Sequence, residues 1–173
     1  MDGEKRREQI IEWLKCSSEP LSGTALARKA GVSRQVIVQD IALLRATNKN
    51  ILSTNKGYIY YRSREAERYT RVIAVKHDNS AMGDELNSIV DAGARVLDVI
   101  VEHDVYGQIA VDLLIESRRD VNDFIVKISG SRIKPLKELT DDHHYHTIDA
   151  PDESILDEVE AVLKEKGYLI LNT

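Results

Sequence analysis

The spacing of hydrophobic residues divides the chain into two stretches of different character. In the first third they recur at helical intervals, as Ile37, Ile41 and Leu44 do, which is typical of an amphipathic helix. From Arg71 onward, alternating or continuously apolar runs typical of β-strands take turns with helical stretches. A short, highly charged stretch separates the two patterns. We therefore expect two domains, at residues 1–62 and 71–173, joined by a linker at residues 63–70.

The first domain carries the signals of a winged helix-turn-helix. Ser22 and Ser33 are placed to cap two helices, and Gly31 supplies the tight turn between them. A turn with a basic, glycine-containing tip then separates two short apolar runs, as in a β-hairpin. The expected helices are residues 4–15, 23–30 and 34–45, and the expected strands are residues 51–54 and 58–61.

The third helix is the expected DNA-recognition helix. If Ile37, Ile41 and Leu44 face the core, the polar side chains of this helix face outward. Gln and Arg can make bidentate contacts with purine edges, and a helix start with a serine suits a phosphate. The residues expected to contact double-stranded DNA are Ser33, Arg34, Gln35, Gln39 and Arg45, together with Lys56 at the hairpin tip. A small helical domain that binds protein is the alternative.

The distribution of charge supports a nucleic-acid partner for the first domain. Residues 1–62 hold 11 Lys and Arg against 6 Asp and Glu, a net charge of +5. Residues 63–173 hold 13 against 23, a net charge of −10, so the overall charge of −5 hides the asymmetry. A basic module joined to an acidic remainder is expected when only one part faces nucleic acid.

The second domain alternates strands and helices. Gly93 and Gly167 each follow a helical stretch and are expected to stop it. The strands are expected at residues 71–77, 95–103, 108–115, 144–150 and 168–171, and the helices at 82–92, 121–129 and 152–166. This order predicts an α+β fold, a ferredoxin-like sandwich with one extra αβ unit.

Three of the five histidines fall between positions 143 and 146, at the start of an expected strand. Residues two apart on a strand share a face, so His144 and His146 point the same way and form half of a metal site. His77 ends the first strand of this domain, and Glu85 follows on the next helix where it can lean toward His77. Three imidazoles and a carboxylate suit Zn, Ni, Co or Fe(II). His143 could replace His144 as the ligand, and a solvated polar turn is the simpler alternative.

Other candidates carry less information. His103 ends another strand before Asp104 and is expected to bind an effector or to support the metal site, with a solvated turn as the alternative. A metalloenzyme would need a base beside the metal, and only Asp141 or Asp142 is near. No His-Glu-x-x-His motif occurs, so we do not expect an enzyme.

Composition narrows the setting of the protein. No apolar run approaches the roughly 18–20 residues of a membrane span, and the first residues show no apolar core of a secretion signal. A single cysteine excludes an internal disulfide. These features predict a cytoplasmic protein with no membrane partner.

The motifs together resemble one family, the niacin-responsive transcriptional repressors, over essentially the whole chain. These repressors join a winged helix to a three-histidine domain. The matching stretches are residues 21–45, the wing 55–58, the strand end 75–77, residues 83–86, residues 99–107 around His103, and His144–His146.

The resemblance implies a homodimeric repressor of niacin transport, niacin salvage or NAD biosynthesis genes, with nicotinic acid as co-repressor. It also implies that His77, Glu85, His144 and His146 bind a divalent transition metal, zinc and nickel foremost. A metal-responsive regulator is the alternative function. A metal-dependent hydrolase with a DNA-binding domain is a third.

Overall fold

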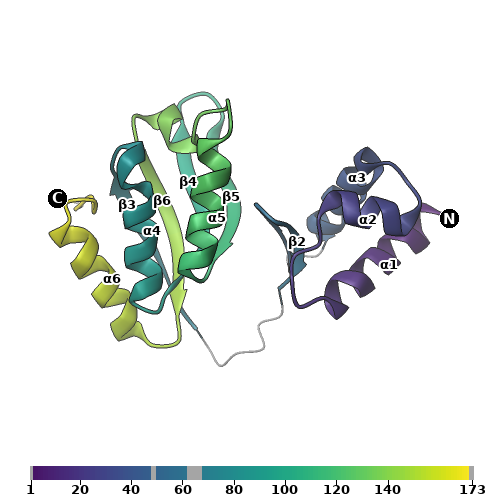
Figure 1. The fold of residues 1–173 in the computed structure, drawn as a ribbon, viewed down its shortest axis with the longest axis horizontal. Helices are drawn as coiled ribbons and strands as arrows, with labels where there is room; N and C mark the ends of the chain where they lie inside the picture. Colours follow the sequence, from purple (N-terminus) through teal and green to yellow (C-terminus); the bar gives the residue numbers. More distant parts are fainter. Residues whose placement is uncertain (1, 48–49, 62–67, 172–173) are drawn as a thin grey trace. The chain divides into compact units, whose positions relative to one another are not determined.

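The computed structural model describes residues 2–47, 50–61 and 68–171, and the chain forms two compact units, Met1–Arg64 and Glu65–Thr173 (Figure 1). Most of the expected linker, residues 63–70, lies outside the described residues. Its last two residues belong instead to a strand, which begins at Tyr69. None of the helices among the described residues is both long and apolar enough to cross a membrane.

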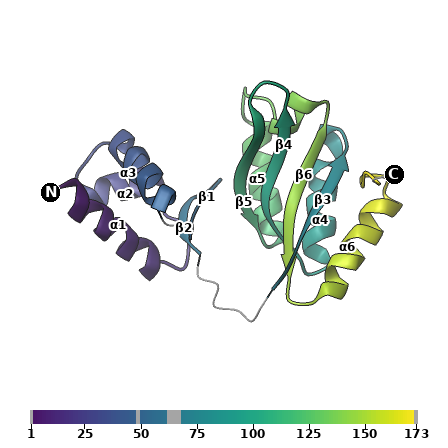
Figure 2. The same ribbon diagram turned by 180° about the vertical axis from the view of Figure 1, so that it is seen from behind.

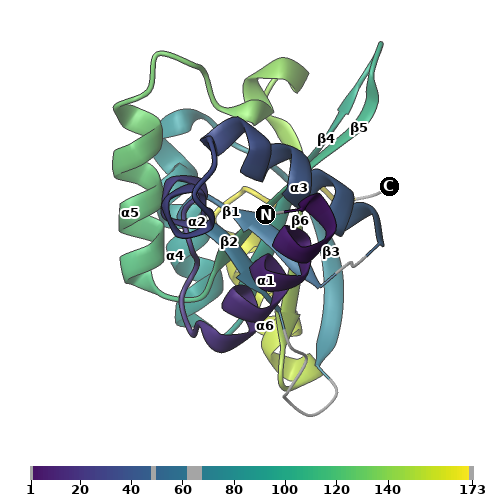
Figure 3. The same cartoon turned by 90° about the vertical axis from the view of Figure 1, so that its right-hand side faces the viewer.

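The first unit is a three-helix bundle followed by a hairpin, as the sequence predicts (Figure 3). Its elements are α1 (Gly3–Cys16), α2 (Gly23–Ala30), α3 (Arg34–Thr47), β1 (Ile51–Thr54) and β2 (Gly57–Tyr60). Ser22 Oγ accepts a hydrogen bond from the Ala25 N–H at 3.1 Å, which caps α2. Gly31 adopts the left-handed conformation that ends α2, with φ of 68°. Ile10, Leu26 and other apolar side chains of the three helices form the core.

The wing is joined to the helix-turn-helix by main-chain hydrogen bonds. The N–H groups of Leu21 and Tyr58 each donate to the other's carbonyl at 2.8 Å. Gly57 lies next to this bridge with φ of 137°, and a Cβ on it would be 2.4 Å from the Leu21 carbonyl oxygen. Only glycine at position 57 permits this close approach. The wing therefore packs directly against the segment before α2.

The second unit is a four-stranded antiparallel sheet with helices on one face (Figures 1 and 2). The sheet order is β3-β6-β4-β5, so the last strand lies between the first two of this unit. The strands are β3 (Tyr69–Lys76), β4 (Arg95–His103), β5 (Gly107–Ile115) and β6 (His143–Ala150). The helices are α4 (Met82–Asp91), α5 (Arg118–Ser129) and α6 (Glu153–Glu165), with short 3-10 turns η1 (Asn79–Ala81) and η2 (Leu136–Thr140). The predicted α+β sandwich, with its extra α6, is confirmed.

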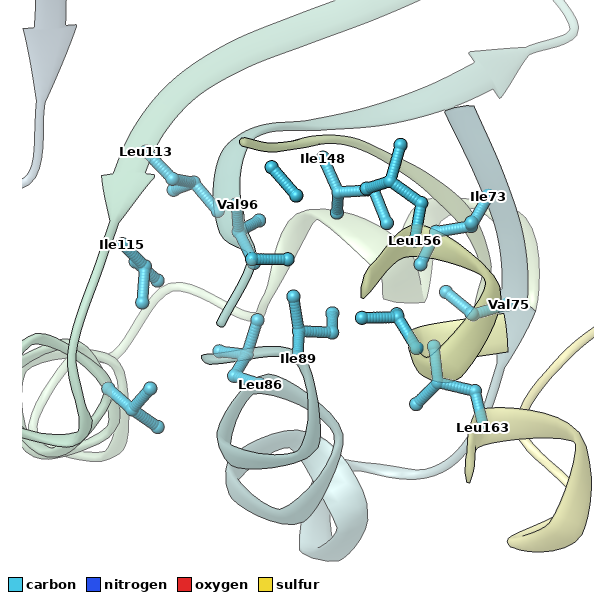
Figure 4. Packing of buried hydrophobic residues seen from close by; sticks show 14 of the residues in the cluster. Ile73, Val75, Leu86, Ile89, Val96, Leu113, Ile115, Ile148, Leu156 and Leu163 are labelled. Carbon is cyan, nitrogen blue, oxygen red and sulfur yellow. The ribbon is translucent and has the colours of Figure 1, made fainter. Parts of the chain in front are cut away.

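The core of this unit lies between the sheet and the helices. Ile73 and Ile148 point from adjacent strands toward Leu86, Ile89 and the apolar face of α6 (Figure 4). Burial of such side chains stabilises the fold by roughly 1.5–3 kcal/mol each. This packing holds α4 against β3 and β6, the elements that carry the candidate metal ligands.

The expected closing strand at residues 168–171 needs correction. Leu169 forms only an isolated antiparallel bridge with Val75. Two further main-chain bonds, from the Lys76 N–H to the Tyr168 carbonyl at 2.9 Å and from the Ile170 N–H to the Ala74 carbonyl at 2.8 Å, complete the contact. The segment covers the edge of β3 but pairs over too few residues to form a strand.

Candidate metal centre and DNA-binding surface

The two candidate ligands on β6 point toward the helices. His144 pairs with Val75 and His146 with Ile73 on β3, and only 2% and 3% of these histidines is exposed. His143 is exposed on the opposite side of the strand. The structure therefore brings His144, rather than His143, to the interior position.

Glu85 lies at the centre of the three imidazoles. It belongs to the first turn of α4 and is fully buried. Its Oε2 lies 2.6 Å from His77 Nε2 and 3.6 Å from His144 Nε2, and its Oε1 lies 3.2 Å from His146 Nε2. The four residues predicted from separate segments of the sequence thus meet around Glu85, with His77 also buried. Ligand atoms of His77, Glu85 and His144 lie within 4.8 Å of one another, and His146 contacts the other oxygen of Glu85.

The other ring nitrogen of each histidine is bonded to the main chain. Nδ1 of His77 lies 2.8 Å from the carbonyl oxygen of Asp78. The same 2.8 Å separates His144 Nδ1 from the Asp142 carbonyl, and 2.6 Å separates His146 Nδ1 from that of Asp98. A carbonyl only accepts, so each Nδ1 carries the proton and each Nε2 is directed to the centre. Metal-ligating histidines are oriented in this way by carbonyl or carboxylate partners.

The charges in the centre are strongly coupled. Burial opposes the charge on Glu85, but the charge of His146 and the close approach of the three imidazole rings hold the Glu85 pKa well below its usual value. Burial also lowers the pKa of His77 and His146, yet Glu85 outweighs it and raises both pKa values. For His144, burial dominates and lowers the pKa. The lowered pKa of Glu85 and the raised pKa values of His77 and His146 show that this centre favours positive charge, which a bound cation would supply in place of protons.

The donor set fits a first-row transition ion. Glu85 Oε1 is buried and accepts no hydrogen bond within the described part of the chain. An inward carboxylate oxygen without a donor is costly unless a cation faces it. Three imidazole nitrogens and this carboxylate would hold such an ion and suit Zn or Ni better than Mg or Ca.

An apolar cavity of about 160 Å³ adjoins three of the four residues. Glu85, His144, His146 and Lys137 line one part of it, and the remaining walls are apolar side chains of α4, α5, β4, β5 and the start of η2, such as Phe124. A cavity with an apolar body and a few convergent polar groups is the usual form of a small-molecule site. The sequence did not indicate it, because its walls come from distant segments with ordinary core patterns.

His103 lies apart from the four residues and does not line this cavity. Its Nδ1 accepts hydrogen bonds from the N–H groups of Val105 at 3.1 Å and Tyr106 at 3.3 Å, which stabilises the turn between β4 and β5. Its ring borders a separate hollow that also includes His143 and Tyr145. The effector-binding role of His103 stays a prediction.

The six predicted DNA contacts are all exposed on the first unit. On α3 the three apolar residues at helical spacing are buried, as expected, and the polar face is outward. Asp40, the one acidic residue of α3, carries no signal in the sequence pattern, yet it is buried and bonded to Arg6 Nε at 2.6 Å and Arg7 Nη1 at 3.4 Å. This pairing keeps the carboxylate off the outward face. A basic winged helix followed by a separate α+β unit defines a two-domain DNA-binding regulator.

Comparison with known proteins gives the family. A model described as the 3H domain matches residues 70–172, and one described as an HTH domain matches residues 6–59. The chain is 44% identical over 170 residues to "Transcription repressor NadR" of Bacillus subtilis (strain 168), covering 97% of this chain and 94% of the relative. It is 41% identical over 167 residues to "Probable transcription repressor NiaR" of Thermotoga maritima, covering 96% and 94%. The chain belongs to the 3H-domain family of transcription repressors, and the resemblance drawn from its sequence is confirmed.

Proposed function

We propose that this repressor binds a divalent transition metal, zinc or nickel, through His77, Glu85, His144 and His146, and that nicotinic acid is its co-repressor. The observation that carries the metal site is the convergence of three Nε2 atoms on a buried carboxylate that has an oxygen without a donor. The resemblance to niacin-responsive repressors supports the choice of nicotinic acid. The controlled genes would be those of niacin transport, salvage or NAD biosynthesis.

The effector would occupy the apolar cavity beside the four residues. Its volume of about 160 Å³ suits one aromatic ring with a small substituent, and its polar groups lie together with the ligands. A bound metal would offer a coordination position to the pyridine nitrogen or the carboxylate. The apolar walls on α4, α5 and the sheet would hold the ring and exclude water.

The repressor would act as a homodimer that places two α3 helices in successive major grooves, roughly 34 Å apart. Nicotinate can strengthen DNA binding only if it favours the DNA-competent arrangement. Linkage then requires DNA to tighten nicotinate binding by the same factor. The similarity to named repressors supports this role and fits the expectation that the chain is not an enzyme.

The test is a titration of a fluorescent operator fragment with the zinc-loaded protein, with and without nicotinate. We expect nicotinate to lower the dissociation constant several-fold and His146→Ala to abolish this response. The variant Gln108→Ala, at an exposed position on β5, is the matched control. Unchanged operator affinity at saturating nicotinate would overturn the effector assignment.

A metal-responsive regulator is the second candidate, because the buried nitrogen-rich centre itself suits a metal sensor. The same titration separates the two functions. Operator binding that follows added metal and ignores nicotinate supports the sensor. Binding that needs both supports nicotinate as the signal and the metal as a resident cofactor.

A further inference from the structure

A buried lysine lies next to the proposed metal centre. Lys137 belongs to η2, and only 3% of it is exposed. Its Nζ donates to the backbone carbonyl of His77 at 3.0 Å and to the carboxylate of Asp142. Burying an ammonium group is costly unless it is paired and hydrogen-bonded, so this position needs a reason beyond filling space.

Both acceptors of Lys137 belong to segments that orient ligands. His77 is itself one of the four residues, at the end of β3. The backbone carbonyl of Asp142 accepts the Nδ1–H of His144 at 2.8 Å and so directs its Nε2 toward Glu85. Lys137 therefore ties the end of β3 to the turn that precedes β6.

That turn has a strained backbone. Asp141 and Asp142 have φ values of 53° and 65°, which lie in the left-handed region that residues other than glycine rarely adopt. Lys137 makes two contacts with this turn. Its side chain donates to the Asp142 carboxylate, and its backbone carbonyl accepts the Asp142 N–H at 3.0 Å. Strained residues persist where surrounding contacts determine them, and they concentrate at functional sites.

We propose that the Lys137–Asp142 pair is a positioning device for the metal centre. It holds the Asp142 carbonyl where the carbonyl fixes the tautomer and direction of His144, and it steadies the backbone of His77. An ammonium group has no lone pair, so Lys137 supports the ligands without being one. The expected effect of Lys137 on metal affinity rests on the proposed metal site. The expected effect of Lys137 on the tautomer of His144 does not depend on a metal.

The first experiment uses the metal-free protein. Long-range ¹H–¹⁵N spectra of the imidazole nitrogens report which nitrogen of each ring carries the proton. We expect His144 in the wild-type protein to carry it on Nδ1 and Lys137→Met to give a mixture of tautomers. His146, which is held by the Asp98 carbonyl, is the internal control and should not change. An unaltered His144 signal in Lys137→Met would overturn the proposal.

The second experiment measures zinc affinity of the full chain by competition with a chromophoric chelator. Removing a partner that orients a ligand typically weakens metal binding about 10–100-fold, and we expect that loss for Lys137→Met. Lys134→Met, an exposed lysine of the preceding loop, is the control and should bind zinc as the wild type does. Wild-type zinc affinity in Lys137→Met would overturn the metal part of the proposal.

Asp142→Asn keeps the test decisive if Lys137→Met does not fold. Asn tolerates the left-handed conformation, so the turn survives while the ion pair is lost. We expect a loss of zinc affinity in the same direction, and wild-type behaviour in both experiments would overturn the proposal. If the wild-type protein binds neither zinc nor nickel, the proposed metal function fails, and the tautomer of His144 alone decides the positioning role.

Discussion

The two units present their functional side chains in opposite ways. On the winged helix the predicted DNA contacts are exposed and surround a conventional apolar core. In the second unit the candidate ligands are buried, and each imidazole has its Nδ1 bonded to a main-chain carbonyl and its Nε2 directed to Glu85. A DNA duplex approaches from outside, whereas an ion must be surrounded. The comparison shows that function and stability are separable in the first unit and joined in the second.

Buried carboxylates sharpen this contrast. Asp40 is paired with arginines from α1, and Asp149 is paired with Arg68 and Arg95 at 2.6–3.0 Å. Glu85 instead faces only imidazoles and keeps one oxygen without a donor in the described structure. Arginine keeps its charge permanently, so the first two pairs are structural. Imidazoles can exchange a proton for a metal, so Glu85 belongs to a site.

The largest effect is expected for Glu85→Gln, which removes the only anion among the four candidate ligands. Zinc affinity should fall by more than about 100-fold, beyond the loss typical of a supporting partner. Chelator competition measures it, with the exposed Glu102→Gln as the control. Retained zinc affinity would show that Glu85 is not a ligand. Glu85 would then be a structural carboxylate like Asp40 and Asp149.

Asp149→Asn should have the opposite profile, with zinc affinity retained and stability lost. Removing one partner of a buried ion pair costs about 3 kcal/mol of unfolding free energy. Denaturant unfolding at pH 7, followed by far-UV circular dichroism, gives the value. A fall in zinc affinity equal to that of Glu85→Gln would show that the pair acts on the site.

The same pair predicts a pH dependence. Burial raises the pKa of Asp149, but Arg95 and Arg68 outweigh it and hold that pKa below its usual value. The stabilisation is therefore present above the unfolded-state pKa of about 3.9 and is lost as the pH falls through the lower folded-state pKa. The stability difference between wild type and Asp149→Asn should shrink in that acidic window, and a difference that grows there would contradict the pairing.

Gly57→Ala tests the packing of the wing, and a measurement of unfolding reports that packing independently of DNA binding. The new Cβ would meet the Leu21 carbonyl and force the backbone out of its φ of 137°, at a cost of about 2–3 kcal/mol. Fluorescence of Trp13 on α1 follows unfolding of this unit. Gly107 in the other unit has φ of 73° but open space around it. Gly107→Ala therefore measures backbone strain alone, and any larger loss of stability in Gly57→Ala comes from the clash with Leu21.

Gln35→Ala should change binding and leave stability unchanged, because Gln35 is exposed on α3. We expect a loss of about 1–3 kcal/mol on the operator and little on random DNA. Fluorescence anisotropy on both duplexes measures the difference. Equal losses on the two would mean that Gln35 contacts no base.

Lys56→Ala should have the smallest effect. A phosphate contact at the wing tip weakens all DNA similarly, and its removal should reduce the salt slope of log K by about 1. A salt titration of anisotropy gives the slope. An effect confined to the operator would assign Lys56 a base contact instead.

The sequence predicted the winged helix closely because its signals are local. Ser22, Gly31 and the hairpin turn act within a few residues, and the structure places the elements within about two residues of the predicted bounds. His144 and His146 followed from strand periodicity alone. His77 and Glu85 could be joined to them only through the sheet, which places β6 beside β3.

The supporting groups of the centre could not be predicted. Lys137 lies in a stretch whose proline indicated only a break, and its partner Asp142 belongs to a left-handed turn formed without glycine. The Asp98 carbonyl reaches His146 where the register between β4 and β6 shifts. Such irregular backbone depends on tertiary contacts and leaves no periodic signal.

The depth of the proposed centre sets how fast an ion could enter or leave it. No more than 7% of any of the four residues is exposed, and three of them line the cavity proposed for the effector. An effector seated in that cavity would lie between the ion and solvent. Its binding would then slow exchange of the ion as well as change DNA binding.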